Sequence, residues 1–186
     1  IFYTPASPET DFGILFIETS GCLPMCGHGT IGAITIGIEE GLLKPKIPGK
    51  VRMETPAGLV EVEYKQTGKK VDWVKFTNVK SYLAATGLTI DCGELGELVF
   101  VVSYGGNFYA IVDQQENFSG IQDFTASRLI QFSQEIREKI NLKYPGKFVH
   151  PENETINGVS HILWTGETLS SEASARNAVF YGDKAI

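Results

Sequence analysis

Met25-Cys26-Gly27-His28-Gly29-Thr30 is the stretch that decides the fold of this chain, because it places a thiol where a helix is expected to begin. A β-like run, 13–18, precedes it, and an all-apolar, helix-like run, 31–38, follows it. Unpaired backbone N–H groups and the positive end of the helix dipole meet at such a junction, where they stabilise a thiolate and a bound carboxylate. A Cys in that setting titrates below the free value of about 8.5. The simpler interpretation is a structural Cys beside a glycine turn, but the motif as a whole favours an acid/base or nucleophilic Cys26.

Hydrophobic periodicity around this motif predicts a strand-rich chain with two helices. The helix over 30–40 is apolar all round and is therefore expected to be buried on every side, with Gly32 and Gly37 allowing close packing. A second, amphipathic helix is expected over 125–142. Residues 86–97, rich in Gly and acidic residues, are expected to connect two lobes. Strands are expected at 14–17, 50–55, 60–64, 71–79, 98–102, 107–113, 159–165 and 173–182.

Four blocks in order carry a resemblance to a known family. Residues 20–32 resemble the first active-site block of the proline racemase family, which includes 4-hydroxyproline epimerases and trans-3-hydroxyproline dehydratases. Residues 105–110, 158–162 and 176–183 agree with later blocks of the same family. The resemblance covers essentially all 186 residues.

The resemblance implies an α+β, diaminopimelate epimerase-like fold, with two strand-rich lobes that each surround a central helix. On this reading, 1–95 is part of the first lobe and carries the catalytic Cys, and 96–186 is part of the second lobe. Members of the family are longer and continue past the last block into a second catalytic segment. We therefore expect an internal fragment in which the fold is incomplete and the second catalytic residue lies outside the chain.

The function that the resemblance implies is epimerisation at the α-carbon of 4-hydroxyproline or proline by two thiols and without a cofactor. Cys26 is the expected acid/base, and the backbone N–H groups of Gly27 and His28 are expected to hold the substrate carboxylate. His161 falls where the family places a His that contacts the substrate. Tyr181 falls where an aromatic side chain shields the ring of proline.

Each of these side chains also has a simpler interpretation. His28 is equally well read as a polar cap of the helix, and His161 as a hydrogen-bonded core residue. Tyr181 could be an ordinary core aromatic. Cys22 and Cys92 are expected to be structural, and His150 has no role that the sequence indicates.

Two other functions stay open at this point. In a trans-3-hydroxy-L-proline dehydratase the second thiol is replaced, typically by Thr, so that elimination occurs instead of epimerisation. A non-catalytic module that binds small carboxylates would keep the carboxylate site without turnover. The residue that follows the last block in the whole protein would separate the first two functions.

Composition limits which partners the protein can be expected to bind and which cellular compartment it can be expected to occupy. The chain is 42% apolar and 20% charged with a net charge of −6, and it has no basic stripe, so a nucleic acid is not expected as a partner. No apolar run is long enough to span a bilayer. Three cysteines are too few for a disulfide framework, which favours a reducing, cytoplasmic location. Cys22, Cys26 and His28 lack obvious further metal ligands, so neither a metal nor a cofactor is expected; a homodimer stays open as the assembly.

Overall fold

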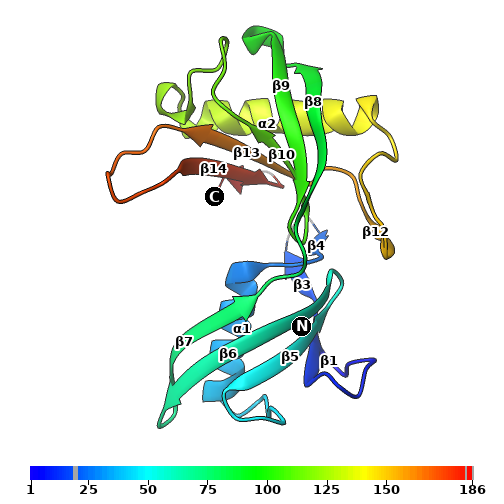
Figure 1. Cartoon of the computed structure of the whole chain (residues 1–186), viewed down its shortest axis with the longest axis vertical. Coiled ribbons are helices and arrows are strands. Elements are labelled where there is room, and N and C mark those ends of the chain that lie inside the picture. Colours follow the sequence, from blue (N-terminus) through cyan, green and yellow to red (C-terminus); the bar gives the residue numbers. More distant parts are fainter. Residues whose placement is uncertain (19–20, 183, 186) are drawn as a thin grey trace. The chain divides into compact units, whose positions relative to one another are not determined.

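The computed structural model describes residues 1–18, 21–182 and 184–185, and it divides the chain into two compact units, Ile1–Lys80 and Ser81–Ile186 (Figure 1). Ser20 and Asp183, which belong to two of the blocks quoted above, lie outside the described residues. Each unit contains one main sheet and one long helix.

The first unit packs helix α1 (Gly27–Glu39) against a five-stranded sheet in the order β1-β2-β5-β6-β7. A short antiparallel pair, β3–β4, precedes the helix. Alternating residues of the sheet, among them Val51, Met53, Val60 and Val62, are buried, as expected for a sheet with one face on a core. The strands are β1 (Phe2–Tyr3), β2 (Phe12–Ile14), β3 (Phe16–Glu18), β4 (Gly21–Leu23), β5 (Lys50–Thr55), β6 (Gly58–Thr67) and β7 (Lys70–Thr77).

The second unit packs helix α2 (Ala126–Lys143) against a six-stranded sheet in the order β15-β14-β13-β10-β9-β8. One face of the helix contributes Leu129, Phe132, Ile136 and Ile140 to the core. The strands are β8 (Tyr82–Asp91), β9 (Glu97–Tyr104), β10 (Phe108–Val112), β13 (His161–Gly166), β14 (Arg176–Tyr181) and β15 (Lys184–Ala185). A separate hairpin consists of β11 (Val149–His150) and β12 (Asn153–Asn157), and two short 3-10 turns are η1 (Gly93–Leu95) and η2 (Ile121–Asp123).

The two units share one construction principle. In the first unit, β2 and β5 are parallel neighbours and the chain between them forms α1. In the second unit, β10 and β13 are parallel neighbours and the chain between them forms α2. A parallel pair requires a long crossover, which is usually a helix. Antiparallel hairpins extend both sheets from these parallel pairs.

Helix α1 corrects the expectation that it is buried on every side. Thr30, Ile34, Gly37 and Ile38 are buried, but Ile36 is 59% exposed. The spacing of the buried residues places them on one stripe that faces the sheet of the first unit. The close packing expected at both interior glycines holds at Gly37, where an added Cβ would lie 2.4 Å from Leu43, but at Gly32 it would meet nothing within 4 Å.

The segment over 86–97 is not a connection between lobes. Most of it belongs to β8 and to the turn that joins β8 to β9 in an antiparallel hairpin. The register shifts twice along this pair, and Gly87 has a φ of 63°. Such irregularities break the alternation by which a strand is found in a sequence. The chain accordingly divides between Lys80 and Ser81, and the correspondence of the two units to the lobes expected from the resemblance stays a prediction.

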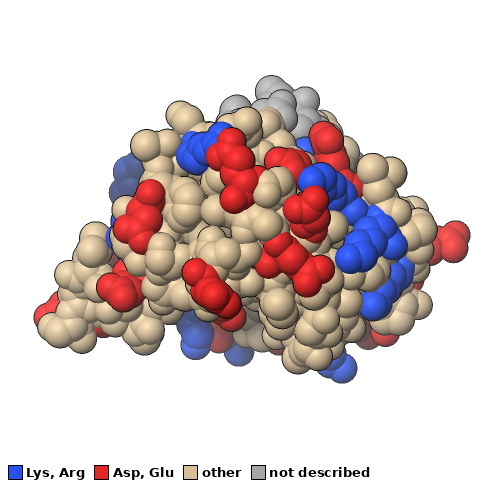
Figure 2. All heavy atoms as spheres, turned by 90° about the horizontal axis from the view of Figure 1, so that it is seen from above, with Lys and Arg blue, Asp and Glu red and all other residues tan. Residues whose placement is uncertain are grey.

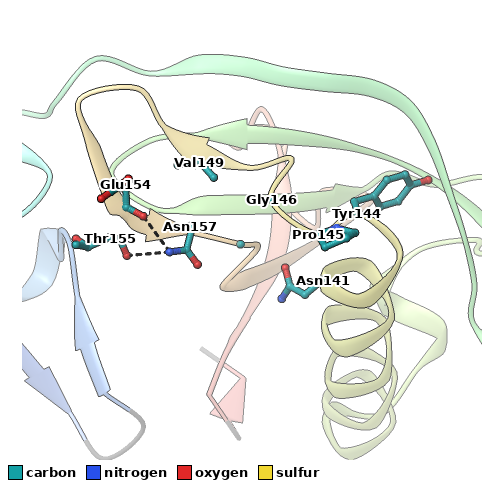
Figure 3. A pocket seen from close by; sticks show the side chains of 9 residues that line it. Asn141, Tyr144, Pro145, Gly146, Val149, Glu154, Thr155 and Asn157 are labelled. Carbon is teal, nitrogen blue, oxygen red and sulfur yellow. Dashed lines mark hydrogen bonds between the residues drawn. The ribbon is translucent and has the colours of Figure 1, made fainter.

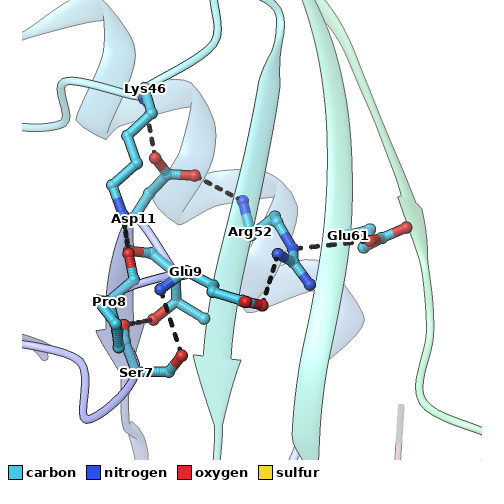
Figure 4. A network of polar contacts seen from close by, with 8 residues as sticks. Ser7, Pro8, Glu9, Asp11, Lys46, Arg52 and Glu61 are labelled. Atoms are coloured by element: carbon cyan, nitrogen blue, oxygen red, sulfur yellow. Dashed lines mark hydrogen bonds and ion pairs between the residues drawn. The ribbon is translucent and has the colours of Figure 1, made fainter.

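A polar network ties the loop before β2 to β5 (Figure 4). The two carboxylate oxygens of Asp11 accept the backbone N–H groups of Lys46 and Arg52 at 2.8 and 2.7 Å. The Arg52 guanidinium forms ion pairs with Glu9 at 3.2 Å and Glu61 at 3.7 Å, but both carboxylates are largely exposed and the Arg52 side chain is 41% exposed. Because exposed ion pairs contribute little, the Asp11 bonds are the main link. They hold β2, which leads towards α1, beside its parallel partner.

Candidate active site

Helix α1 begins at Gly27, directly after Cys26, so the thiol lies at the helix N-terminus. Cys26 is the N-cap residue, with extended backbone angles of φ −141° and ψ 113°. Its Sγ atom accepts the N–H of Gly29 at 3.4 Å, and its carbonyl oxygen accepts the N–H of Thr30 at 2.9 Å. A side-chain acceptor on the N3 amide is the usual N-cap arrangement. Here sulfur takes the place that a Ser, Thr or Asp oxygen normally fills.

Two backbone donors at this helix end have no acceptor within the helix. The N–H groups of Gly27 and His28 lie in the first turn, where no carbonyl group four residues earlier belongs to the helix. Gly27 and Gly29 also let neighbouring side chains approach closely, since an added Cβ would lie 3.1 Å from Phe76 or 2.8 Å from Phe16. The helix start therefore presents an anion-binding backbone beside a half-buried thiol.

The side chain of His28 is exposed, and the cap of the helix is Cys26. The interpretation of His28 as the polar cap is therefore wrong. Thr30 belongs to the motif, but the sequence assigned it no role of its own; it is fully buried and its hydroxyl donates to the Cys26 carbonyl at 2.9 Å. A Thr one turn after an N-cap is the pattern that could have indicated it.

The second group of expected site residues lies in the second unit, on two neighbouring strands. His161 on β13 and Tyr181 on β14 are directly opposite in the antiparallel register, and their rings stack with centroids 4.5 Å apart. On the other side, Tyr109 on β10 is the parallel partner of His161, again with a centroid distance of 4.5 Å. The imidazole thus lies between two phenol rings, of which the sequence indicated only one.

His161 is 6% exposed and is also held at its edge. Its Nδ1 atom lies 2.8 Å from the hydroxyl of Ser160. Burial, and secondarily the positive charge of Arg137, lower the pKa of His161 to about 4. Arg137 itself donates to the carbonyl of Gly182 at 3.2 Å. His161 is therefore a neutral, hydrogen-bonded side chain near pH 7, which agrees with its simpler interpretation as a hydrogen-bonded core residue. A role of His161 in substrate contact stays a prediction.

The expected residues therefore form two groups. Cys26, Gly27 and His28 lie together at the start of α1 in the first unit. His161 and Tyr181 are in contact in the second unit, with Tyr109 and Ser160 as neighbours that sequence reasoning missed.

The other two cysteines differ from each other. Cys92 is fully buried, and burial together with the nearby Glu135 raises the pKa of its thiol to about 12. This agrees with a structural role. Cys22 on β4 is exposed, and the expectation that it is structural stays a prediction. The ring of His150 lies against that of Tyr104, with the centroids 4.8 Å apart and the planes tilted by 46°, and its Nδ1 atom accepts the N–H of Glu152.

A cavity of about 870 Å³ lies between the C-terminal end of α2 and the β11–β12 hairpin (Figure 3). Its lining includes Asn141 and Tyr144 from the helix side and Asn157 from the hairpin. The Asn157 side chain donates to the backbone carbonyls of Glu154 and Thr155 within the hairpin. The described residues that line this cavity include neither His161 nor Tyr181.

Three further observations concern surface charge, metal ligands and membrane-spanning helices. On the face seen in Figure 2, Asp and Glu side chains are scattered with Lys and Arg side chains between them. Among residues 1–18, 21–182 and 184–185, no group of three or more His, Cys, Asp or Glu side chains is arranged to hold a metal ion. Neither helix of the described chain is long and apolar enough to cross a membrane.

Comparisons with known proteins identify relatives of this chain. The chain is 61% identical, over all of its 186 residues, to a 4-hydroxyproline 2-epimerase of Spirosoma linguale, and it covers 55% of that protein. A crystal structure of a probable proline racemase from Agrobacterium radiobacter superimposes with a TM-score of 0.85 at 25% identity, over 99% of this chain and 54% of the other. A hydroxyproline epimerase from Agrobacterium vitis, crystallised with trans-4-hydroxy-L-proline, superimposes with a TM-score of 0.84 at 24% identity, over 97% and 51%.

These likenesses confirm the α+β fold expected from the sequence, and the chain spans about half the length of the relatives that it matches. The sequence profile described as proline racemase matches residues 1–186, the whole chain. The chain belongs to the proline racemase family.

Proposed function

We propose that the protein containing this chain is an isomerase that epimerises 4-hydroxyproline at its α-carbon, with proline as the related substrate. The observation that carries the proposal is the position of Cys26 as N-cap of α1, with the Gly29 N–H donated to its sulfur. The relatives at 56–61% identity are 4-hydroxyproline epimerases, which favours this substrate over others in the family.

The chemistry requires only proton transfer. The Cys26 thiolate removes the α-proton, and the electron pair of the broken C–H bond delocalises into the substrate carboxylate. The N–H groups of Gly27 and His28 bind that carboxylate, so backbone donors and the helix dipole lie where negative charge grows. A second thiol, outside this chain, returns a proton to the opposite face and inverts the centre. One proton leaves and one is added, so the step needs no oxidant or reductant, and the proposed mechanism uses no cofactor.

His161 and Tyr181 are proposed to contact the substrate ring. A flat aromatic surface of the kind that Tyr181 offers suits a pyrrolidine ring. His161 supplies a polar edge for the hydroxyl, and its low pKa leaves it uncharged at neutral pH. Replacing His161 by Phe should therefore weaken turnover of hydroxyproline more than turnover of proline.

We propose that the protein acts in the cytoplasm on a small-molecule substrate, without a nucleic acid or membrane partner; a homodimer stays open as the assembly. The net charge of −6 supports the absence of a nucleic acid partner. Sedimentation of the whole protein at several concentrations tests the dimer.

The test is inversion of trans-4-hydroxy-L-proline by the whole protein, followed by optical rotation and by α-deuterium incorporation in D₂O. Cys26→Ser should abolish both signals, because the serine hydroxyl is a far weaker base. Cys22→Ser is the matched control, since Cys22 is an exposed cysteine four residues away on β4, and it should keep wild-type rates. Full activity of Cys26→Ser would refute the proposed role of this thiol.

The same assay separates the other functions. Loss of water from trans-3-hydroxy-L-proline, without inversion of the 4-hydroxy substrate, would identify a dehydratase. Binding of pyrrole-2-carboxylate, a planar mimic of the carbanion, without turnover of either substrate would identify a binding module.

A further inference from the structure

The imidazole of His161 is clamped on both faces by residues on neighbouring strands. Tyr109, His161 and Tyr181 occupy matching positions on β10, β13 and β14. The interplanar angles are 31° to Tyr109 and 20° to Tyr181, so both phenol rings lie roughly flat against the imidazole. A ring held in this way presents only its edge to a ligand. The orientation of that edge depends on what its two nitrogens bind.

The contacts of Ser160 favour one of the two neutral tautomers of His161. Its hydroxyl oxygen lies 2.8 Å from His161 Nδ1 and 3.4 Å from the carbonyl oxygen of Phe108. A carbonyl can only accept, and a serine hydroxyl has one proton to donate. Both contacts are hydrogen bonds at the same time only if Ser160 donates to Phe108 and accepts from an Nδ1–H of His161. The backbone N–H of Ser160, which donates to the same carbonyl at 3.1 Å, fixes the serine at this position.

The tautomer decides the chemistry of the other nitrogen. A neutral imidazole protonated at Nδ1 has a lone pair at Nε2, so that atom accepts hydrogen bonds. Burial and Arg137 keep the pKa of His161 well below neutrality, and this preserves the lone pair under ordinary conditions. A ring hydroxyl can donate to such an acceptor, whereas an unsubstituted ring carbon cannot.

We propose that Ser160 and Tyr109 are positioning residues that hold His161 as a hydrogen-bond acceptor for the ring hydroxyl of 4-hydroxyproline. This inference rests on the proposed function. Ser160 sets the tautomer, and Tyr109 completes the aromatic clamp that Tyr181 forms on the opposite face. The pair thereby contributes to the preference for a hydroxylated ring.

The kinetic test uses variants of the whole protein. Ser160→Ala should raise KM for trans-4-hydroxy-L-proline roughly tenfold with a smaller change in kcat, the effect of weakening one hydrogen bond to bound substrate. Ser160→Thr, which keeps the hydroxyl, should restore most of the loss, and Tyr109→Leu should raise KM as Ser160→Ala does. Thr165→Val is the matched control, because Thr165 lies on β13 with His161 and its hydroxyl donates to Asp113 at 2.9 Å.

A second ligand separates positioning from general damage to the fold. Pyrrole-2-carboxylate has no ring hydroxyl, so Ser160→Ala should change its Kd less than twofold. Equal losses for substrate and for pyrrole-2-carboxylate, or a KM in Ser160→Ala equal to that of Thr165→Val, would overturn the proposal.

The tautomer itself can be measured without any positioning variant. In whole protein labelled with ¹⁵N-histidine, the His161 signals, assigned by their loss in His161→Phe, should show a protonated Nδ1 and a bare Nε2 at pH 7. A protonated Nε2 would overturn the proposal even if the variants fail to fold. Failure of the proposed function is distinct, because wild-type protein would then leave 4-hydroxyproline unchanged whatever the tautomer.

Discussion

The hydroxyl of Thr30 donates to the carbonyl oxygen of Cys26 at 2.9 Å, the same atom that receives the backbone N–H of Thr30. One residue thus makes two bonds to the carbonyl of the proposed catalytic cysteine. The hydroxyl is also 3.7 Å from the sulfur of Met25, and Thr30 is fully buried. Thr30 therefore fixes the backbone on which the thiol is mounted.

Replacing Thr30 by Val should destabilise the protein by about 1 kcal/mol, because it deletes a buried hydrogen bond while nearly keeping the side-chain shape. The midpoint of urea unfolding measures the change. Thr30→Ser keeps the hydroxyl and serves as the comparison for the bond to Cys26. An unchanged midpoint in Thr30→Val would show that the backbone bond alone fixes Cys26.

The three cysteines should react with iodoacetamide at very different rates. Cys26 has a backbone N–H donated to its sulfur, which stabilises negative charge there, so we expect it to label first. Cys22 should follow, and Cys92 should stay unlabelled at pH 8 in folded protein, because it is fully buried and its pKa is raised to about 12. Peptide mass spectrometry over time gives the order. Labelling of Cys22 ahead of Cys26 would contradict it.

Two glycines of α1 should respond oppositely to alanine. At Gly29 an added Cβ would lie 2.8 Å from the buried ring of Phe16, so Gly29→Ala should destabilise the protein by about 1–3 kcal/mol through overpacking. At Gly32 the Cβ would meet nothing within 4 Å, so Gly32→Ala should stabilise by up to about 1 kcal/mol through helix propensity. Thermal unfolding of the two variants decides, and a shift of the same sign in both would be the contrary result.

Stability should depend on the protonation of His161. The pKa is lowered from 6.5 to about 4 in the folded protein, so between these values the unfolded chain binds the extra proton. The contribution of neutral His161 to the free energy of unfolding is therefore fully present above pH 6.5. It is lost as the pH falls towards 4, and the loss amounts to about 3 kcal/mol.

The variant His161→Phe isolates this contribution. Its unfolding free energy, measured by urea titration from pH 7 to pH 4, should fall less steeply than that of the wild type. Carboxylates titrate in both proteins, so only the difference between the two slopes reports on His161. Parallel slopes would mean that His161 is as accessible to protons in the folded state as in the unfolded state.

Much of the fold was predictable because the hydrophobic pattern of each short segment indicates whether it forms a strand or a helix. Strand β5 matches the expected range of 50–55, and the alternation of Val60 and Val62 with Glu61 and Glu63 correctly predicted β6. The amphipathic pattern over 125–142 found α2 almost to the residue. The hairpin of β8 was missed because Gly87 and two register shifts interrupt its alternation. The exposure of Ile36 was missed because an apolar helix does not reveal which of its sides other elements cover.

Of the two groups of candidate site residues, only the group around Cys26 was predictable from the sequence. Cys26 is recognisable because the thiol, the glycines and the helix start are neighbours in sequence. The surroundings of His161 are not, since Ser160 and Phe108 are 52 positions apart and meet only because β10 and β13 pair in parallel. Nothing in the local sequence around Tyr109 indicates that it faces His161. Long-range strand pairing is the information that periodicity lacks.

The parallel pairing of β2 with β5 has a kinetic consequence for the first unit. Asp11 and Arg52 are 41 positions apart, so the chain must close a long loop before these strands can join, whereas the β5–β6 and β6–β7 hairpins form from local contacts. Helix α1 lies within that loop and packs against β7, which lies outside it, so we expect the helix to dock once the loop has closed on the sheet. We therefore expect Cys26 to reach its final environment late in refolding. The change in reactivity of its thiol during refolding should then report on the last step of assembly.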